Sequence, residues 1–177
     1  MNVPQRSPWG KVDSAAEIAP GIMSISTPGH GGVKLDRARN AQMPKAVRRK
    51  GGWYEEDCEW ALVALVFPDA FEGHVEDARR SVKDWFPVGY EAITGDTVAV
   101  EDSRVLRQRA FEADTADKFV ARSARGDWAD DVPTGMVGIT AFKRSTGDTE
   151  TFLVPADEYN ARSEFGYVVD ECSFAPH

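Results

Sequence analysis

The residues of this chain with the clearest potential for chemistry lie in a glycine-rich stretch and in an acidic segment further along. His30 stands within Pro-Gly-His-Gly-Gly at 28–32. Glycines let a backbone approach a ligand closely, and an imidazole can donate, accept or ligate near neutral pH. The acidic segment at 53–60 reads Trp-Tyr-Glu-Glu-Asp-Cys-Glu-Trp. A general acid or base needs a partner within hydrogen-bond reach, so the candidate catalytic residues are His30, Glu56, Asp57 and Cys58.

Each of these residues also has a structural interpretation, which the sequence favours. His30 can stand exposed in a tight turn between two strands. At helical spacing, Asp57 falls at the edge of an apolar stripe, where a half-buried carboxylate needs a partner such as Arg48, Arg49 or His30. Cys58 falls in the middle of that stripe, where a buried thiol is inert packing. A nucleophilic pair of Cys58 and His30 requires both residues in one cleft.

Motifs for nucleotide, acyl-transfer or metal chemistry are missing from the sequence. There is no GxGxxG, GxxxxGK[ST], GxSxG or CxxC pattern. His30, His74 and His177 are far apart, and none has a second His or Cys at ligand spacing. The sequence therefore predicts no metal and no cofactor, and it favours a protein that is not an enzyme.

Charge is distributed unevenly along the chain, whose net charge is −8. Residues 1–50 contain nine Lys or Arg and three Asp or Glu, whereas residues 51–177 contain twelve and twenty-six. Such a bipolar chain indicates either a charged partner or an internal electrostatic match. The negative remainder disfavours direct nucleic-acid binding by the basic patch, which consists of Arg37, Arg39, Lys45, Arg48, Arg49 and Lys50.

Acidic residues form the alternative surface for a partner. A row of carboxylates can imitate the phosphates of a nucleic acid and occupy the basic groove of an enzyme by complementary charge. An acidic surface that only keeps the protein in solution is the simpler interpretation. The candidate partner-binding residues are Glu55, Glu56, Glu59, Asp127, Asp130 and Asp131.

Two helices and several strands must position these residues. Apolar spacing predicts a central buried helix over 54–67, ended by Pro68, and an amphipathic helix over 74–85. Asp36 is expected to cap a short helix to residue 41. Shorter helices are expected at 44–50 and 155–163, and 103–112 is either helical or irregular.

The strands predict an α+β class with antiparallel pairing. They are expected at 10–18, 21–27, 33–35, 97–100, 118–123, 135–144, 149–154 and 166–170, with a hairpin loop at 145–148. Strands, then helices, then strands argue against a βαβ sheet. A chain of 177 residues fits a single domain, divided into a basic β-rich part (1–50), a helical part (51–95) and a part that is mostly antiparallel sheet (96–177).

The surroundings of the protein are predicted from its cysteines and apolar runs. Cys58 and Cys172 each stand alone, which favours free thiols in a reducing compartment. The first residues carry no apolar signal segment, and no apolar run approaches the roughly 18 residues of a membrane span. The expected location is the cytoplasm, away from membranes.

Several longer strings resemble a family of small proteins of unknown function. They are SPWGKVD, IAPGIMSISTPGHGGVKL, GGWYEEDCEWALV, VPTGMVGITAF and TFLVPADEY, and the resemblance runs from Ser7 to about Asp170. Relatives of this kind are carried by phages, prophages and conjugative elements of proteobacteria. The resemblance implies an accessory protein, a class that often acts against host defences such as CRISPR–Cas complexes and restriction nucleases.

These observations lead to one preferred function and two alternatives. The preferred function is a non-enzymatic accessory protein that binds a protein partner through its acidic surface, a candidate inhibitor of a host defence nuclease. The first alternative is a small hydrolase or transferase with a site formed by the GHGG loop and residues 56–58. The second is a module that binds an anion or nucleotide in that loop. The sequence leaves the oligomeric state open.

Overall fold

The structure is a computed structural model that describes residues 2–171 and 173. It contains α-helices and antiparallel sheets, which confirms the predicted α+β class. The chain divides into two compact units, residues 1–107 and 108–177, and each is described by itself. Single-domain organisation stays a prediction, because compactness alone does not show that a unit folds independently.

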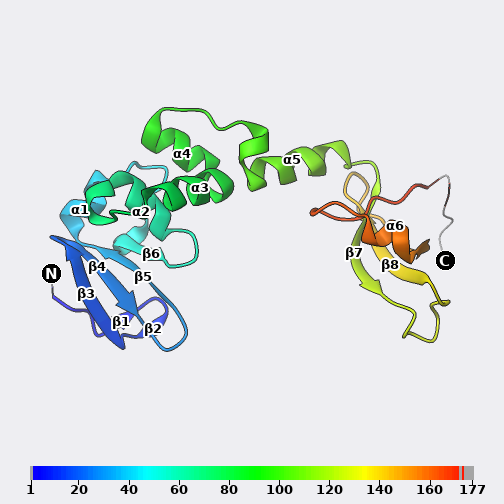
Figure 1. Cartoon of the computed structure of the whole chain (residues 1–177), viewed down its shortest axis with the longest axis horizontal. Helices are drawn as coiled ribbons and strands as arrows, with labels where there is room; N and C mark the ends of the chain where they lie inside the picture. Colours follow the sequence, from blue (N-terminus) through cyan, green and yellow to red (C-terminus); the bar gives the residue numbers. More distant parts are fainter. Residues whose placement is uncertain (1, 172, 174–177) are drawn as a thin grey trace. The chain divides into compact units, whose positions relative to one another are not determined.

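A four-stranded antiparallel sheet is the centre of unit 1. Its order is β3-β4-β5-β6, drawn from blue to cyan in Figure 1. The register pairs Ile22 with Leu35 and Gly32 with Glu55. Two short strands form a separate ribbon before it. The strands are β1 (Arg6–Ser7), β2 (Gly10–Lys11), β3 (Ser14–Ala19), β4 (Ile22–Ser26), β5 (Gly31–Leu35) and β6 (Trp53–Glu55).

Both faces of this sheet are covered. Ile22 of β4 belongs to the core shared with the helices, whereas the alternating Met23 and Ile25 are buried on the opposite face. On that opposite face, Gly32 lies against the ring of Trp9, and a Cβ at Gly32 would collide with the ring. Trp9 in turn packs edge-on against Trp53, with ring centroids 5.7 Å apart. Trp9 therefore ties the segment before β2 to the sheet of unit 1.

The helices of unit 1 lie on the face of the sheet that carries Ile22. Asp36 caps α1 by accepting the N–H of Arg39, as predicted. Ala61, Leu62, Val63 and Ala64 of α2 are fully buried, which makes this helix the centre of the core. The helical elements are α1 (Arg37–Gln42), η1 (Lys50–Gly52), α2 (Trp60–Val66), η2 (Pro68–Ala70), α3 (Val75–Trp85), α4 (Pro87–Thr94), η3 (Val100–Asp102) and α5 (Arg104–Asp114), whose last residues belong to unit 2.

The predicted helix over 54–67 is too long at its start. Trp53–Glu55 pairs with β5 as strand β6, and turns occupy 56–59 before α2 begins at Trp60. The helix over 74–85 is confirmed as α3. No α-helix forms at 44–50, where turns occupy 45–47 and the 3-10 helix η1 begins at Lys50, and 97–100 contains no strand. The region 103–112, open between two interpretations, is helical as α5.

Unit 2 is a three-stranded antiparallel sheet with a short helix. Its strands are β7 (Phe119–Arg125), β8 (Met136–Lys143) and β9 (Thr149–Pro155), in the order β7-β8-β9, and α6 (Ala156–Asn160) follows. The predicted hairpin loop is confirmed, since Lys143 N–H donates to the Asp148 carbonyl at 2.9 Å. The predicted strand at 166–170 forms only an isolated bridge, between Val120 and Val168.

Unit 2 has its own buried centre. Ile139, Ala141 and Val154 are fully buried, and Phe152 packs against Phe119 with ring centroids 5.3 Å apart. Within the part of the chain that the structure describes, neither unit has a helix of the length and apolarity that a membrane crossing requires.

Candidate functional site

The loop that carries His30 is held in one conformation by Thr27. The hydroxyl and the N–H of Thr27 both donate to the His30 carbonyl, at 2.6 and 2.7 Å. The His30 N–H donates back to the Thr27 hydroxyl at 3.1 Å. The imidazole itself is 56% exposed. The predicted turn between two strands is therefore present, and its backbone is fixed while its imidazole remains accessible.

Strand pairing brings two carboxylates to His30. The β5–β6 register places Glu55 opposite Gly32, and the Glu56 N–H continues the pairing by donating to the Gly31 carbonyl at 3.1 Å. His30 Nδ1 consequently lies 3.6 Å from Glu55 Oε1 and 3.8 Å from Glu56 Oε1. These three residues form the histidine–glutamate cluster of unit 1.

Gly31 makes room for one of these carboxylates. A Cβ at this position would overlap Glu56 Oε2 and would lie 2.9 Å from the Ile25 carbonyl oxygen. Because glycine has no side chain, the Glu56 carboxylate can lie against the loop backbone. This close approach explains why the loop needs a glycine directly after His30.

Glu55 is oriented by its neighbours on one side only. Its Oε2 accepts the Asp57 N–H at 2.8 Å, and its own N–H donates to Glu59 Oε2 at 3.3 Å. Its Oε1 is buried and has no hydrogen-bond partner among the described residues. A buried acceptor without a donor is costly and is uncommon in native proteins.

Two of the predicted catalytic residues do not join the cluster. Asp57 is exposed in the turn before α2, so its predicted place at the edge of an apolar helical stripe is wrong. Cys58 is a half-buried free thiol in the same turn, outside the helix. Burial, followed by the charges of Asp57, Glu55 and Glu59, raises the pKa of the Cys58 thiol. A protonated thiol is a poor nucleophile. Cys172 and His177 lie outside the described residues.

Half of the predicted basic patch is engaged within unit 1. Arg48 donates to the carbonyls of Met43 and Ala41, both at 2.7 Å. Arg49 bonds Glu59 at 2.7 Å. Arg39 donates to the Pro20 carbonyl at 3.0 Å and lies over the ring of Phe67. Four members of the patch are exposed, namely Arg37, Lys45, Arg48 and Lys50. The internal electrostatic match considered from the sequence is thus present between Arg49 and Glu59.

An open groove of about 800 Å³, here called the acidic groove, lies beside the cluster. Its floor includes Ser24, Ser26 and Val33 of strands β4 and β5. Trp60 forms a wall, with its ring 6.2 Å from that of Phe71 and 6.5 Å, edge-on, from that of His74. The groove carries three carboxylates, those of Glu56, Asp69 and Glu72.

Sequence reasoning found only part of this groove. Glu56 was expected on a partner-binding surface, but Asp69, Glu72 and the aromatic wall were missed. A signal was available, because Asp69 and Glu72 surround Phe71 directly after the predicted end of a helix. This signal could not reveal the strands that form the floor of the groove, because their residues lie more than thirty positions earlier in the chain.

The remaining acidic candidates lie in unit 2. Asp127 and Asp130 are exposed in the loop between β7 and β8, on either side of Trp128, which is 79% exposed. Asp131 in the same loop bonds the Arg125 guanidinium, and Arg125 keeps a raised pKa because of that hydrogen bond. Glu55, Glu56 and Glu59 belong to unit 1, so each unit carries its own acidic group.

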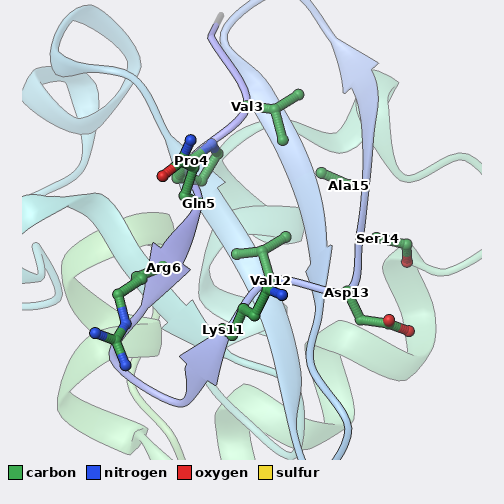
Figure 2. A pocket seen from close by; sticks show the side chains of 9 residues that line it. All are labelled: Val3, Pro4, Gln5, Arg6, Lys11, Val12, Asp13, Ser14 and Ala15. Atoms are coloured by element: carbon green, nitrogen blue, oxygen red, sulfur yellow. The ribbon is translucent and has the colours of Figure 1, made fainter.

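A hollow of about 610 Å³ lies between the N-terminal segment and the start of β3. Figure 2 shows its lining, in which the side chains of Arg6 and Asp13 point in different directions. Among the described residues, the one group of His, Cys, Asp or Glu side chains close enough to share a metal ion is the histidine–glutamate cluster, and none of its members lines this hollow.

Fold and site together define an α+β protein with a histidine–glutamate cluster beside an acidic groove. The chain belongs to the DUF7007 family, described as a domain of unknown function, whose family model matches residues 2–116. The match covers the sheet, the cluster and the groove of unit 1. Neither a curated protein nor a solved structure matches the chain.

Proposed function

We propose that this chain is a binding protein without enzymatic activity, and that the acidic groove takes a cationic segment of a protein partner. The observation that carries the proposal is the joining of an aromatic wall to three carboxylates in one groove. Arginine matches both features, because its planar guanidinium stacks on an aromatic face and pairs with carboxylates in bidentate fashion.

The charges of the groove are available to such a partner. Asp69 and Glu72 form no salt bridge with a cation among the described residues, in contrast to Glu59, which is occupied by Arg49. Glu56 faces His30 with one oxygen, and 49% of its side chain is exposed. An incoming arginine over Trp60 would therefore meet uncompensated negative charge, and complementary charge accelerates association and selects the partner.

Unit 2 offers a second contact. Tryptophan is enriched at protein interfaces, where it contributes strongly when buried by a partner. Trp128 stands exposed between Asp127 and Asp130, so the unit 2 loop combines an aromatic anchor with negative charge as the groove does. Both surfaces support a basic partner.

The finer proposal is that the partner is a nucleic-acid-binding enzyme of a host defence system and that the chain comes from a phage or other mobile element. Basic grooves of such enzymes provide the arginines that the acidic groove would bind. The resemblance of the sequence to proteins of mobile elements supports this origin. On this proposal the chain acts in the cytoplasm of the host.

Acid–base catalysis is the second candidate function, because His30 Nδ1 converges on Glu55 and Glu56, although at 3.6 and 3.8 Å neither carboxylate is within hydrogen-bond reach. A hydrolase or transferase with a thiol nucleophile receives less support, since Cys58 is not part of the cluster and its pKa is raised. An anion-binding role of the loop is opposed by the same two carboxylates, which repel negative charge.

Binding of a short arginine-rich peptide tests the groove directly. The double variant Asp69→Asn, Glu72→Gln keeps the shape of both side chains and removes their charge, so the dissociation constant measured by calorimetry should rise about tenfold, equivalent to ~1.4 kcal/mol. Asp96→Asn, Glu101→Gln is the matched control, since both residues are exposed in unit 1 outside the groove. Equal effects of the two double variants would show that only net charge matters.

Phage plating on a host with an active restriction or CRISPR–Cas nuclease tests the finer proposal. The wild-type chain and the Asp96→Asn, Glu101→Gln control should raise plating efficiency, and the Asp69→Asn, Glu72→Gln variant should not. If no version changes plating, a defence nuclease is not the partner, while the result of the peptide titration keeps its meaning.

A further inference from the structure

We propose that His30, Glu55 and Glu56 bind one divalent cation of the first transition series. The inference does not rest on the peptide-binding function, but the two sites share Glu56. Sequence spacing predicted no metal site here. The reason is that the ligands come from two chain segments that only strand pairing brings together.

The ligand atoms already converge. One nitrogen of His30 and one oxygen from each glutamate lie within 4.8 Å of one another. Ligands around a shared zinc ion sit about 2.0–2.2 Å from the metal, so these atoms must close up by roughly 1 Å. The exposed fractions of the His30 and Glu56 side chains, 56% and 49%, leave both free to rotate by that amount.

The buried oxygen of Glu55 is an independent sign of a missing ligand. Its Oε1 has no hydrogen-bond donor among the described residues, and His30 Nδ1 lies 3.6 Å away, beyond hydrogen-bond distance. An unsatisfied buried oxygen asks for an explanation such as a bound ion. A cation placed between Glu55 Oε1 and His30 Nδ1 would satisfy both atoms together.

The surroundings hold the ligands in the way that metal sites require. The Asp57 N–H fixes Glu55 through the oxygen that faces away from His30. Thr27 fixes the His30 backbone, and the missing side chain of Gly31 lets Glu56 approach. Such outer contacts orient metal ligands and tune their affinity.

The donor set indicates the class of cation. One imidazole nitrogen with two carboxylate oxygens suits zinc or a similar transition metal, whereas magnesium and calcium prefer oxygen donors throughout. Three protein ligands leave at least one position for water. Since Glu56 also lines the acidic groove, a bound cation would reduce the negative charge available to an arginine there.

Calorimetric titration of the full chain with zinc, and with magnesium for comparison, tests the site. We expect one zinc ion per chain and no magnesium binding at the same concentrations. His30→Ala and Glu55→Gln should each weaken zinc binding at least tenfold, while the matched controls His74→Ala and Glu72→Gln in the groove should change it less than twofold. Circular dichroism checks that each variant is folded.

Two further variants keep the test decisive. Gly31→Ala retains all three ligands but displaces Glu56, so zinc binding should weaken. Cys58→Ser removes the nearby thiol and should leave zinc binding unchanged. Absence of zinc binding, zinc binding that survives His30→Ala and Glu55→Gln, or zinc binding lost in Cys58→Ser would each overturn the site. His30→Ala should leave peptide affinity in metal-free buffer within twofold, which separates this site from the groove.

Discussion

Unit 1 and unit 2 differ in the balance between their basic and acidic residues. Unit 1 contains fourteen basic and sixteen acidic residues, a net charge of −2, whereas unit 2 contains seven and thirteen, a net charge of −6. The basic segment 1–50 folds into the same unit as the acidic residues that follow it, and Arg49 bonds Glu59 there. The bipolar pattern of the chain is thus largely neutralised inside unit 1.

The difference in net charge indicates where on the protein an acidic surface could bind a partner. In unit 1 overall charge is nearly balanced, so the proposed recognition of a basic partner would depend on a local group of carboxylates, those of the acidic groove. In unit 2 the excess is general, and attraction for a basic partner would be less specific and more sensitive to salt. The two units also differ in core size, with fifteen buried core residues described in unit 1 and eight in unit 2, which predicts that unit 2 is less stable.

The largest expected effect concerns the separation of the two cores. Phe152→Ala removes the ring that packs against Phe119 and should cost unit 2 about 3–5 kcal/mol. Hydrogen exchange measured by mass spectrometry should show lost protection across 119–155 and retained protection in β4 and α2. Leu62→Ala, at a fully buried site in unit 1, is the matched change and should give the reverse pattern. Loss of protection in both units together would contradict two separate cores.

A smaller effect is expected where unit 1 packs its N-terminal segment. Gly32→Ala introduces a Cβ that overlaps the Tyr54 carbonyl oxygen and the Trp9 ring. Overpacking of this kind costs about 1–3 kcal/mol, measured by urea unfolding. Gly147→Ala is a control in unit 2, since no atom lies within 4 Å of the added Cβ and any cost comes from its positive φ of 81°. Equal losses would show that the overlap with the Tyr54 carbonyl oxygen and the Trp9 ring adds nothing to the cost of backbone strain.

Charge pairing gives a still smaller effect. A double-mutant cycle on Arg49 and Glu59, whose side chains are 34% and 27% exposed, should give a coupling of about 0.5–1 kcal/mol. The pair of Arg125 and Asp131 in unit 2 has a more exposed carboxylate, so its coupling should be smaller and should fall further in salt. A larger coupling for Arg125 and Asp131 than for Arg49 and Glu59 would contradict the expectation that charge pairing is stronger in unit 1 than in unit 2.

The smallest effect expected near neutral pH concerns the ionisation of Tyr54, which is buried. Burial raises the pKa of Tyr54 above its usual 10.0, despite the opposing hydrogen bond and charge of Arg49. Stability from the neutral phenol is therefore complete below pH 10.0 and is lost as pH rises through the raised pKa. Tyr54→Phe should flatten the alkaline loss of stability in unit 1, measured as unfolding free energy against pH. An unchanged slope would contradict this assignment.

Elements with local signals were predictable from the sequence. The cap by Asp36, the amphipathic helix α3 and the β8–β9 hairpin each depend on residues a few positions apart, so short-range patterns identify them. The helix predicted over 54–67 began too early because the apolar spacing of 54–58 is compatible with a helix. Pairing of Trp53–Glu55 with β5 overrides that spacing, and such pairing leaves no mark within the segment itself.

The sequence by itself determined which groups are available: one histidine between glycines, a run of carboxylates near it, and a chain with opposite charge in its first and later parts. Only the tertiary structure decided which of them meet. The strand register places Glu55 and Glu56 next to His30, whereas Asp57 and Cys58 lie outside the cluster. The physical reason is that hydrogen-bonded pairing between distant strands fixes positions that no spacing along the chain encodes.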